Sequence, residues 1–249
     1  LVGSEMCIRD STQSDYVGAL CTRVKSLTNG IYGSVFCAED ALSDAELFDC
    51  NVVVDLSRVG SMETKSLLMG ILVSVVVGMA LTLPISSAAI CAALSLTGLA
   101  GGAAVAGCCA QMVGFAVMSF RENGVGGLVS QGLGTSMLQM PNIIRNPRTW
   151  IPPTLASAIT GPIATCLFHL EMNGPAVSSG MGTCGLVGQI GVYTGWLNDI
   201  AAGTKTAIVP MDWVGLILIC FVLPAVLTLL FAFFLRKWGW IKDGDLKLQ

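Results

Sequence analysis

Charged and hydrophobic positions divide the chain into two parts that suit different solvents. Up to Lys65 a charged residue recurs every few positions, whereas residues 66–120 contain no ionisable side chain except cysteine. A helix needs about 20 apolar residues to cross a hydrocarbon core of about 30 Å. The uncharged stretch is therefore long enough for two membrane crossings, whereas the first 65 residues have the pattern of a soluble protein.

The same pattern predicts two further crossings later in the chain. Residues 213–235 form an uncharged apolar run that ends at a basic pair. Residues 149–170 form another, with Pro152 and Pro153 in the first turn, where a missing N–H costs least. The four predicted crossings are 67–83, 98–120, 149–170 and 213–235.

Two glycine-rich uncharged segments, 123–150 and 172–198, do not suit lipid-exposed helices. Gly and Pro weaken a helix, and amide side chains in lipid need hydrogen-bond partners. We expect both segments to be re-entrant or broken, with irregular backbone packed inside protein. Residues 85–98 are short and rich in Ser and Ala, and they predict a re-entrant hairpin. The predicted fold class is an all-α integral membrane protein with about four transmembrane helices, these two segments and a short α/β-like soluble N-terminal fragment.

Composition supports a membrane protein and argues against a nucleic-acid-binding one. Hydrophobic residues make up 53% of the chain, charged residues 12%, and the mean hydropathy is +0.74. An ordinary soluble domain has about 25% charged residues. Residues 1–65 hold five basic and ten acidic side chains, whereas the rest holds eight basic and six acidic ones. No strongly basic surface is predicted, so we expect no nucleic-acid partner.

Positive charges predict the orientation, because cytoplasmic loops near membrane ends are enriched in Lys and Arg. A cytoplasmic C-terminal tail places Arg121, Arg145 and Arg148 on the same side and the loop 199–212 outside. Both ends of the chain are then cytoplasmic. The first 65 residues are hydrophilic and contain no short apolar core, so we expect no cleavable signal peptide.

Of the ten cysteines, six are predicted to be small buried side chains at contacts between helices. No CxxC pair and no His/Cys cluster with ligand spacing occurs, so we expect no metal site and no cofactor. A disulfide scaffold is typical of short secreted chains with dispersed polar loops, a different pattern. Six cysteines lie in apolar or glycine-rich surroundings and suit small buried side chains: Cys91, Cys108, Cys109, Cys166, Cys184 and Cys220.

Polar side chains beside the predicted broken helices suggest a site for a polar solute, with no catalytic residue. Discontinuous membrane helices expose N–H and C=O groups that bind such solutes. The Glu171 carboxylate either sits in headgroup water or faces a cavity and accepts hydrogen bonds from hydroxyls. His169 is either a solvated packing residue or a sugar or proton partner, and the neutral amides suit an uncharged polyol. The predicted substrate-binding residues are Gln131, Thr135, Ser136, His169, Glu171, Asn173, Thr183 and Gln189.

Two stretches of the chain resemble a transport family. They are "GGLVSQGLGTSMLQMPNIIRNPRTWIPPTLASAITGPIATCLF" and "NGPAVSSGMGTCGLVGQIGVYTGWLNDIAAGTK". Both resemble the membrane EIIC-type domain of the bacterial phosphotransferase system, in the subfamily that includes perfringolysin-regulator-like proteins. The resemblance runs from about residue 68 to the end. Family members are longer on the N-terminal side, so helices that precede residue 67 in them have no counterpart here.

The resemblance implies a function, a location and partners. It implies a multi-pass domain in the bacterial cytoplasmic membrane that binds and translocates a sugar. A partner IIB subunit carries the phosphoryl group on a residue of its own and phosphorylates that sugar, and IIA is a further partner. The chain itself then performs no independent catalysis, and a homodimer in the lipid bilayer is compatible with the family.

The N-terminal residues resemble other sequences. Residues 1–11, LVGSEMCIRDS, resemble translated sequencing adapter, and residues 12–65 resemble a fragment of a HerA/VirB4-type ATPase domain. Residues 51–55 suit a buried parallel strand, whose terminal acid is either structural or a Mg²⁺ partner in an NTPase. We predict a chimeric join within residues 66–73, with a true fusion as the alternative. The predicted parts are 1–11, 12–66 and 67–249.

Three functions are compatible with these patterns. The leading one is a sugar permease component of a phosphotransferase system. The alternative is a membrane-embedded regulator that keeps the EIIC-like fold and signals ligand occupancy, since the chain carries no phosphorylatable IIB segment. An ATP-dependent motor rests only on residues 12–65, and the chain contains no GxxxxGK[ST] phosphate loop to support it.

Overall fold

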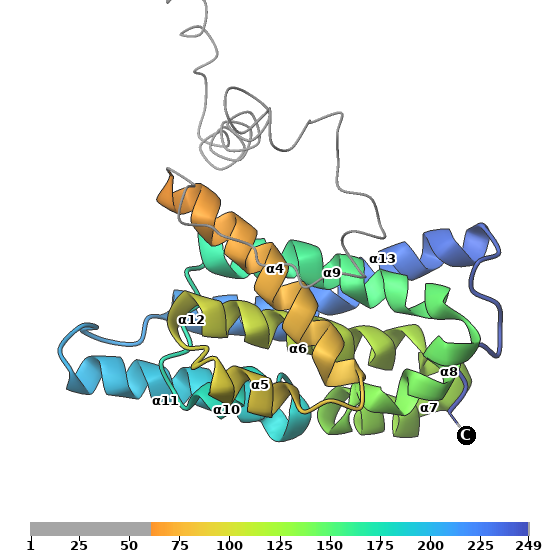
Figure 1. The fold of residues 1–249 in the computed structure, drawn as a ribbon, viewed down its shortest axis with the longest axis horizontal. Coiled ribbons are helices and arrows are strands. Elements are labelled where there is room, and N and C mark those ends of the chain that lie inside the picture. Colours follow the sequence, from red (N-terminus) through yellow and green to blue (C-terminus); the bar gives the residue numbers. More distant parts are fainter. Residues whose placement is uncertain (1–60, 249) are drawn as a thin grey trace, which may run out of the picture. The chain divides into compact units, whose positions relative to one another are not determined.

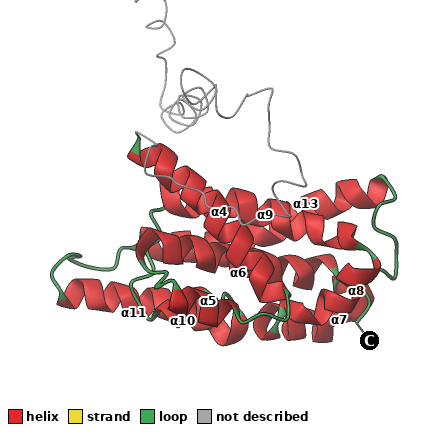
Figure 2. Cartoon of the chain, in the orientation of Figure 1, coloured by secondary structure: helices red, strands yellow, loops and turns green. Residues whose placement is uncertain are grey.

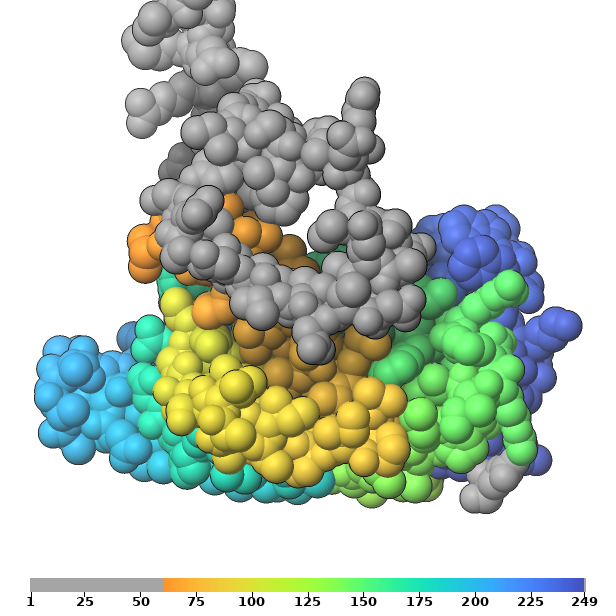
Figure 3. Space-filling model, in the orientation of Figure 1, coloured from red at the N-terminus to blue at the C-terminus, as the bar shows by residue number. Residues whose placement is uncertain are grey.

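The computed structural model describes residues 61–248, which fold into helices joined by short turns (Figures 1 and 2). Figure 3 shows one face of these residues as a space-filling view. Within these residues the only β-type pairing is an antiparallel bridge between Gly98 and Met172. The predicted all-α class is confirmed for this part of the chain. The α-helices are α4 (Met62–Thr82), α5 (Ser87–Ala93), α6 (Gly98–Met118), α7 (Phe120–Val129), α8 (Met140–Arg145), α9 (Ile151–Pro162), α10 (Ala176–Ser179), α11 (Val187–Ala201), α12 (Pro210–Ile217) and α13 (Leu223–Lys237). Shorter elements are the π-helical turns η1 (Ser130–Gly134), η4 (Ile163–Leu167) and η6 (Leu218–Val222), and the 3-10 turns η2 (Ser136–Gln139), η3 (Pro147–Trp150) and η5 (Cys184–Leu186).

Helix α6 runs through the middle of the bundle, with α4, α9 and α13 packed against it (Figure 1). Its sequence is rich in Gly, Ala and Cys, and every residue from Gly101 to Ala116 is buried. In lipid the hydrophobic effect does not drive helices together. Contacts between membrane helices are stabilised by close packing, which small residues allow because the two backbones can approach each other. The composition of α6 therefore explains why it can occupy the centre.

Helices α4 and α6 meet backbone to backbone. Gly107 lies against the main chain of Ser74, and Gly78 lies against the carbonyl of Gly107. A Cβ atom added at either glycine would overlap main-chain atoms of the other helix. The Ser74 hydroxyl donates to the Ser157 carbonyl of α9 over 2.9 Å, and Gly161 of α9 also lies against Ser74. Three helices thus converge on one serine.

Three helical stretches among the described residues are long and apolar enough to cross a membrane: α4, α6 and the combined stretch Pro210–Lys237. In α6 the surrounding protein buries 89% of an apolar stretch of 18 residues. In α4 and in Pro210–Lys237 it buries 33% of the corresponding stretch. Their open faces carry large apolar side chains such as Val76, Leu229 and Phe233. Soluble proteins rarely expose apolar surface on this scale, so lipid is the expected surround.

The predicted crossings agree with these three stretches. Residues 98–120 match α6, and 213–235 lie inside Pro210–Lys237. Residues 67–83 match α4, although the helix begins earlier, at Met62, and so includes two charged residues in its first turns. Helix α4 continues without a break through residues 66–73, where the chimeric join is predicted.

The predicted crossing 149–170 is a series of shorter elements, η3, α9 and η4. Helix α9 has only 12 residues, and Pro162 at its end removes one backbone donor before the π-helical turn. Regular α-helix therefore does not extend over a membrane-spanning length here. A fourth crossing stays a prediction.

Residues 123–150 form short helices where we expected irregular backbone. Helix α7 bends at Gly124, whose φ of 59° and ψ of −154° suit glycine alone. The elements η1, η2, α8 and η3 follow in close succession. Gln131 and Gln139 are fully buried, whereas Val125 and Ile144 are well exposed, so only part of the segment is packed inside protein and a re-entrant path stays a prediction.

The glycine-rich segment 172–198 contains a regular helix, α11, which the expectation of broken backbone missed. Gly188, Gly191 and Gly195 are buried in this helix and contact neighbouring main chain or side chains closely. These contacts offset the low helix propensity of glycine, because tertiary packing supplies most helix stability in proteins. Residues 85–98 contain the seven-residue helix α5.

The predicted adapter sequence, 1–11, lies outside the described residues. The same holds for all but the last few residues of the ATPase-like part, 12–66.

Candidate functional site

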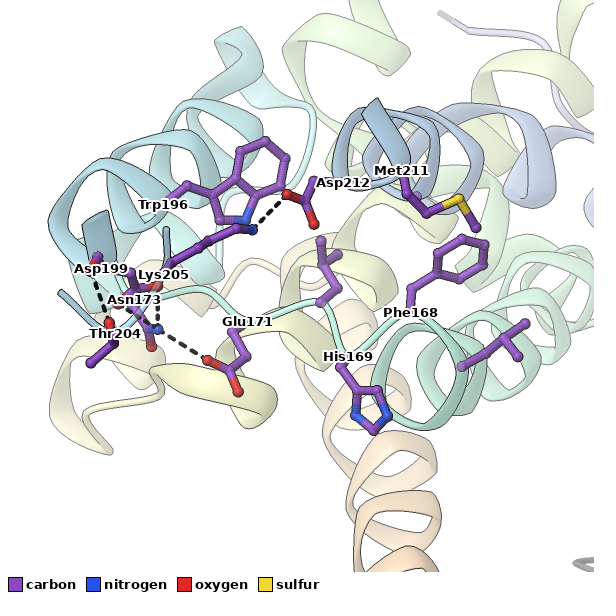
Figure 4. Close-up of a pocket in the computed structure, with 13 residues that line it drawn as sticks. Phe168, His169, Glu171, Asn173, Trp196, Asp199, Thr204, Lys205, Met211 and Asp212 are labelled. Carbon is purple, nitrogen blue, oxygen red and sulfur yellow. Dashed lines mark hydrogen bonds and ion pairs between the residues drawn. The ribbon is translucent and has the colours of Figure 1, made fainter. Parts of the chain in front are cut away.

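A polar cavity of about 420 Å³ lies beside the first turns of α12. Its walls come from the segment after η4, from α11, from the loop that follows α11 and from α12 (Figure 4). Small-molecule sites in proteins have volumes of about 300–1,000 Å³. The side chains that give it polar character are His169, Glu171, Asn173, Asp199, Thr204, Lys205 and Asp212.

One wall of this cavity is a non-helical segment, residues 168–174, between α6 and α11. His169 adopts a positive φ of 44° just after η4 and turns the chain out of the helix. The main chain of the segment touches Gly102 of α6 on one side and Gly195 of α11 on the other. A Cβ atom at either glycine would overlap that main chain, so the glycines make room for the segment.

The backbone bridge to Gly98 sets the direction of the side chains in this wall. Met172 donates to and accepts from Gly98 through hydrogen bonds of 2.9 and 3.0 Å, and its side chain is fully buried. In extended backbone, successive side chains point to opposite faces. Glu171 and Asn173 therefore both point away from the core and into the cavity.

Asn173 joins two carboxylates at the centre of the site. Its Nδ2 group donates to both carboxylate oxygens of Asp199, over 3.1 and 2.9 Å, and to Oε2 of Glu171 over 3.2 Å. Glu171 is exposed to the cavity, and Asp199 is half-buried at the end of α11. The remaining carboxylate lone pairs can accept hydrogen bonds from solute hydroxyl groups.

The opposite wall carries an ion pair. Lys205 Nζ lies 2.6 Å from an Asp212 oxygen and 5.1 Å from the ring centroid of Trp196. The same Asp212 oxygen accepts a hydrogen bond of 2.9 Å from the Val209 backbone and fixes the start of α12. Lys205 is therefore held by Asp212 and Trp196. Its positive charge is used there, so the side of the cavity that carries Glu171 is negatively charged.

The cavity offers hydrogen-bond donors and acceptors to a polar solute, and its charged groups are mainly acidic. Three carboxylates face one ammonium group, and the Asn173 amide and Thr204 hydroxyl add uncharged polar atoms. His169 also lines the cavity, but its ring points away from the Asn173 group (Figure 4). Among residues 61–248, no three His, Cys, Asp or Glu side chains are grouped so that they could hold a metal ion.

Comparison with known protein families identifies the family of the chain. A family model described as Phosphotransferase system, EIIC matches residues 57–248, which is more than half of the chain. The chain belongs to the EIIC family of the phosphotransferase system. No curated protein and no solved structure matches it.

Family membership makes the EIIC domain a multi-pass membrane component of sugar transport. EIIC domains work with IIA and IIB subunits and with sugar substrates. The predicted resemblance is confirmed at this level, whereas the subfamily, the ATPase and adapter resemblances and a homodimer stay predictions. The match begins at residue 57, upstream of the predicted join within residues 66–73.

Three of the predicted sugar-binding residues line the cavity of the EIIC domain: His169, Glu171 and Asn173. The other predicted residues lie elsewhere, and most of their polar atoms are committed to partners within the protein. Those residues are Gln131, Thr135, Ser136, Thr183 and Gln189.

Gln131 belongs to a chain of buried amides that holds the C-terminal tail. Its Nε2 group donates to Ser119 Oγ over 2.8 Å, and its Oε1 atom accepts from Gln139 Nε2 over 2.9 Å. Gln139 also donates to the Leu246 carbonyl over 3.0 Å and accepts from Asn142 over 2.8 Å. These carboxamides bind peptide backbone and one another in the structure, and a role of Gln131 in sugar binding stays a prediction.

Thr135 and Ser136 have structural contacts of their own. The Thr135 hydroxyl accepts a hydrogen bond of 3.2 Å from the Met137 backbone and caps η2. The Ser136 hydroxyl lies 2.9 Å from the hydroxyl of Thr82, at the end of α4. Both hydroxyls therefore tie the turn after η1 to its surroundings.

Thr183 and Gln189 lie against the core around α6. The Thr183 hydroxyl donates to the Gly132 carbonyl over 2.5 Å, and Gln189 Nε2 donates to Cys109 Sγ over 3.2 Å. Gln189 Oε1 is buried without a hydrogen-bond partner in the structure. Gln189 thus keeps one unused acceptor, but it lies outside the cavity lining.

The predicted site did not include the charged residues Asp199, Lys205 and Asp212 of the cavity, nor its Trp196 and Thr204. The three charged residues belong to the loop that was predicted to lie outside, with no role in binding. A usable signal was present, because Asp199, Lys205 and Asp212 are the only charged side chains between Glu171 and Arg236. An isolated charged group in a membrane protein is a candidate site by default.

Proposed function

We propose that the EIIC domain binds an unphosphorylated sugar beside Glu171 and translocates it for phosphorylation by a partner IIB subunit. The observation that carries this proposal is the placement of the Glu171 carboxylate and the Asn173 carboxamide on a non-helical segment in a 420 Å³ cavity. Broken backbone among membrane helices is the usual setting of a transport site.

The charge of the cavity argues against an anionic substrate. Glu171, Asp199 and Asp212 outnumber Lys205, so the lining is negative overall. A phosphoryl group carries about −1.5 to −2 charges at neutral pH, and this charge is repelled by the lining. The unphosphorylated sugar is therefore expected to bind this cavity better than the sugar phosphate.

We propose that the cavity faces the outside of the cell and that IIB approaches the opposite face. Asp212 and Arg236 lie near the two ends of Pro210–Lys237, whose 28 residues extend about 40 Å at about 1.5 Å per residue. The positive-inside rule supports a cytoplasmic position for the end with Arg236 and for Arg121 and Arg148.

The proposal predicts sugar accumulation that depends on IIB. The full chain is produced together with IIA and IIB proteins from neighbouring reading frames, in bacteria that lack their own permeases for the sugars tested. We expect one radiolabelled sugar to accumulate as its phosphate, and we expect no accumulation when IIB is omitted. Product chromatography measures this outcome directly.

Two other results would change the assignment. A sugar that binds the purified protein but never accumulates would favour the membrane-embedded regulator over the permease. Accumulation of free sugar without IIB would contradict coupling to phosphorylation.

A further inference from the structure

A second cavity, of about 510 Å³, lies between the ends of α6, α7 and α13. Its lining is mainly apolar and includes Val117, Leu128, Leu229 and Phe233. Leu229 and Phe233 are also exposed on a membrane-spanning stretch that the rest of the protein covers only in part. A lipid molecule can therefore reach this cavity from the bilayer.

The cavity lies near the level where hydrocarbon meets headgroups. Arg236 Nη2 donates to the Met118 carbonyl over 3.3 Å, which places the last turns of α13 and α6 side by side. Trp238 and Trp240 follow directly and are exposed. Tryptophan is enriched at both membrane–water interfaces. The charged end of the cavity therefore lies at headgroup depth.

Two guanidinium groups line this cavity, and they differ in their partners. Arg236 is paired with Glu122 at 3.3 Å and with Asp243 at 3.1 Å. Arg121 is exposed, and no residue within 61–248 pairs or hydrogen-bonds with its side chain. The cavity thus combines apolar walls with one cation that the described protein does not neutralise.

We propose that this cavity binds an anionic phospholipid, with its headgroup phosphate on Arg121 and one acyl chain along Leu128, Leu229 and Phe233. A guanidinium group forms strong, paired hydrogen bonds with phosphate oxygens. Basic pockets between membrane helices bind anionic headgroups in this manner. The bound lipid links α7 to α13, and its binding is independent of the sugar cavity at the other end of Pro210–Lys237.

Native mass spectrometry of the full chain, delipidated in detergent, tests this site. Phosphatidylglycerol and phosphatidylcholine with the same acyl chains are added in parallel titrations. We expect the unchanged chain to bind phosphatidylglycerol about tenfold more tightly than phosphatidylcholine. The substitution Arg121→Gln should lower the affinity for phosphatidylglycerol about tenfold, because one charge-assisted contact is lost. Leu229→Trp, which fills the apolar wall, should weaken both lipids.

Lys237→Gln is the matched control, because Lys237 is an exposed cation at the same end of α13 but does not line the cavity. We expect this variant to bind phosphatidylglycerol within about twofold of the unchanged chain, since exposed charges contribute little. An equal loss of affinity for phosphatidylglycerol in Lys237→Gln and Arg121→Gln would overturn the site, because it would show that the lipid binds to surface charge in general. Equal binding of the two lipids would overturn it as well.

Discussion

Replacing Gly107 with alanine is expected to destabilise the membrane bundle strongly, because it forces apart two helices that meet backbone to backbone. The added Cβ atom would overlap the carbonyl and neighbouring main-chain atoms of Ser74, so α4 and α6 must separate. Overpacking of a rigid core typically costs about 1–3 kcal/mol and occasionally more. We expect a loss of about 3 kcal/mol or more, because both partners are helix backbone and neither can move alone.

Thermal unfolding in detergent, followed by circular dichroism and by the monodisperse fraction on size exclusion, measures this effect. Gly126→Ala is the matched control, since a Cβ atom at Gly126 in α7 meets nothing within 4 Å. Alanine favours helix over glycine by about 1 kcal/mol, so this control should be neutral or slightly stabilising. Similar melting temperatures for the two variants would show that α4 and α6 do not meet at Gly107.

Replacing Glu171 with glutamine is expected to weaken sugar binding by about tenfold to a hundredfold. The substitution keeps the size and removes the charge that accepts hydrogen bonds from sugar hydroxyls. A hydrogen bond to a charged group contributes about 1.5–3 kcal/mol, which corresponds to this range of affinity. Isothermal titration of the purified full chain with the accumulated sugar measures the dissociation constant.

Asp243→Asn provides a control for loss of an acidic charge, because the Asp243 side chain is 95% exposed and lies outside the sugar cavity. Its affinity for the sugar should equal that of the unchanged chain. An unchanged affinity in Glu171→Gln would contradict sugar binding in this cavity. It would not affect membership in the EIIC family.

The long apolar helices were predictable because charged residues bound uncharged runs of membrane-spanning length. Residues 98–120 were predicted as one crossing, and α6 ends only two residues earlier, at Met118. Helix α11 was harder to predict, since each of its glycines lowers helix propensity by about 1 kcal/mol. Close contacts with the segment that precedes it, such as Gly191 against Gly174, are what make this helix stable.

The candidate site was predictable only on one side. Glu171 and Asn173 are close in sequence and beside a break in a helix, so local pattern pointed to them. Asp199 and Asp212 are isolated charged residues and therefore candidate site residues, but their place beside Glu171 depends on tertiary structure, which hydropathy does not encode. Gln131 suited a sugar equally well by chemistry, but a buried carboxamide can bind peptide backbone, and here it joins the amides that hold the C-terminal tail.

A crystal structure of the full chain with its accumulated sugar bound would test the central claim most directly. The account predicts sugar density in the 420 Å³ cavity, with a hydroxyl within hydrogen-bonding distance of the Glu171 carboxylate and another near Asn173 or Asp199. Sugar density elsewhere, for example beside the unpaired Gln189 oxygen, with this cavity empty would contradict the account.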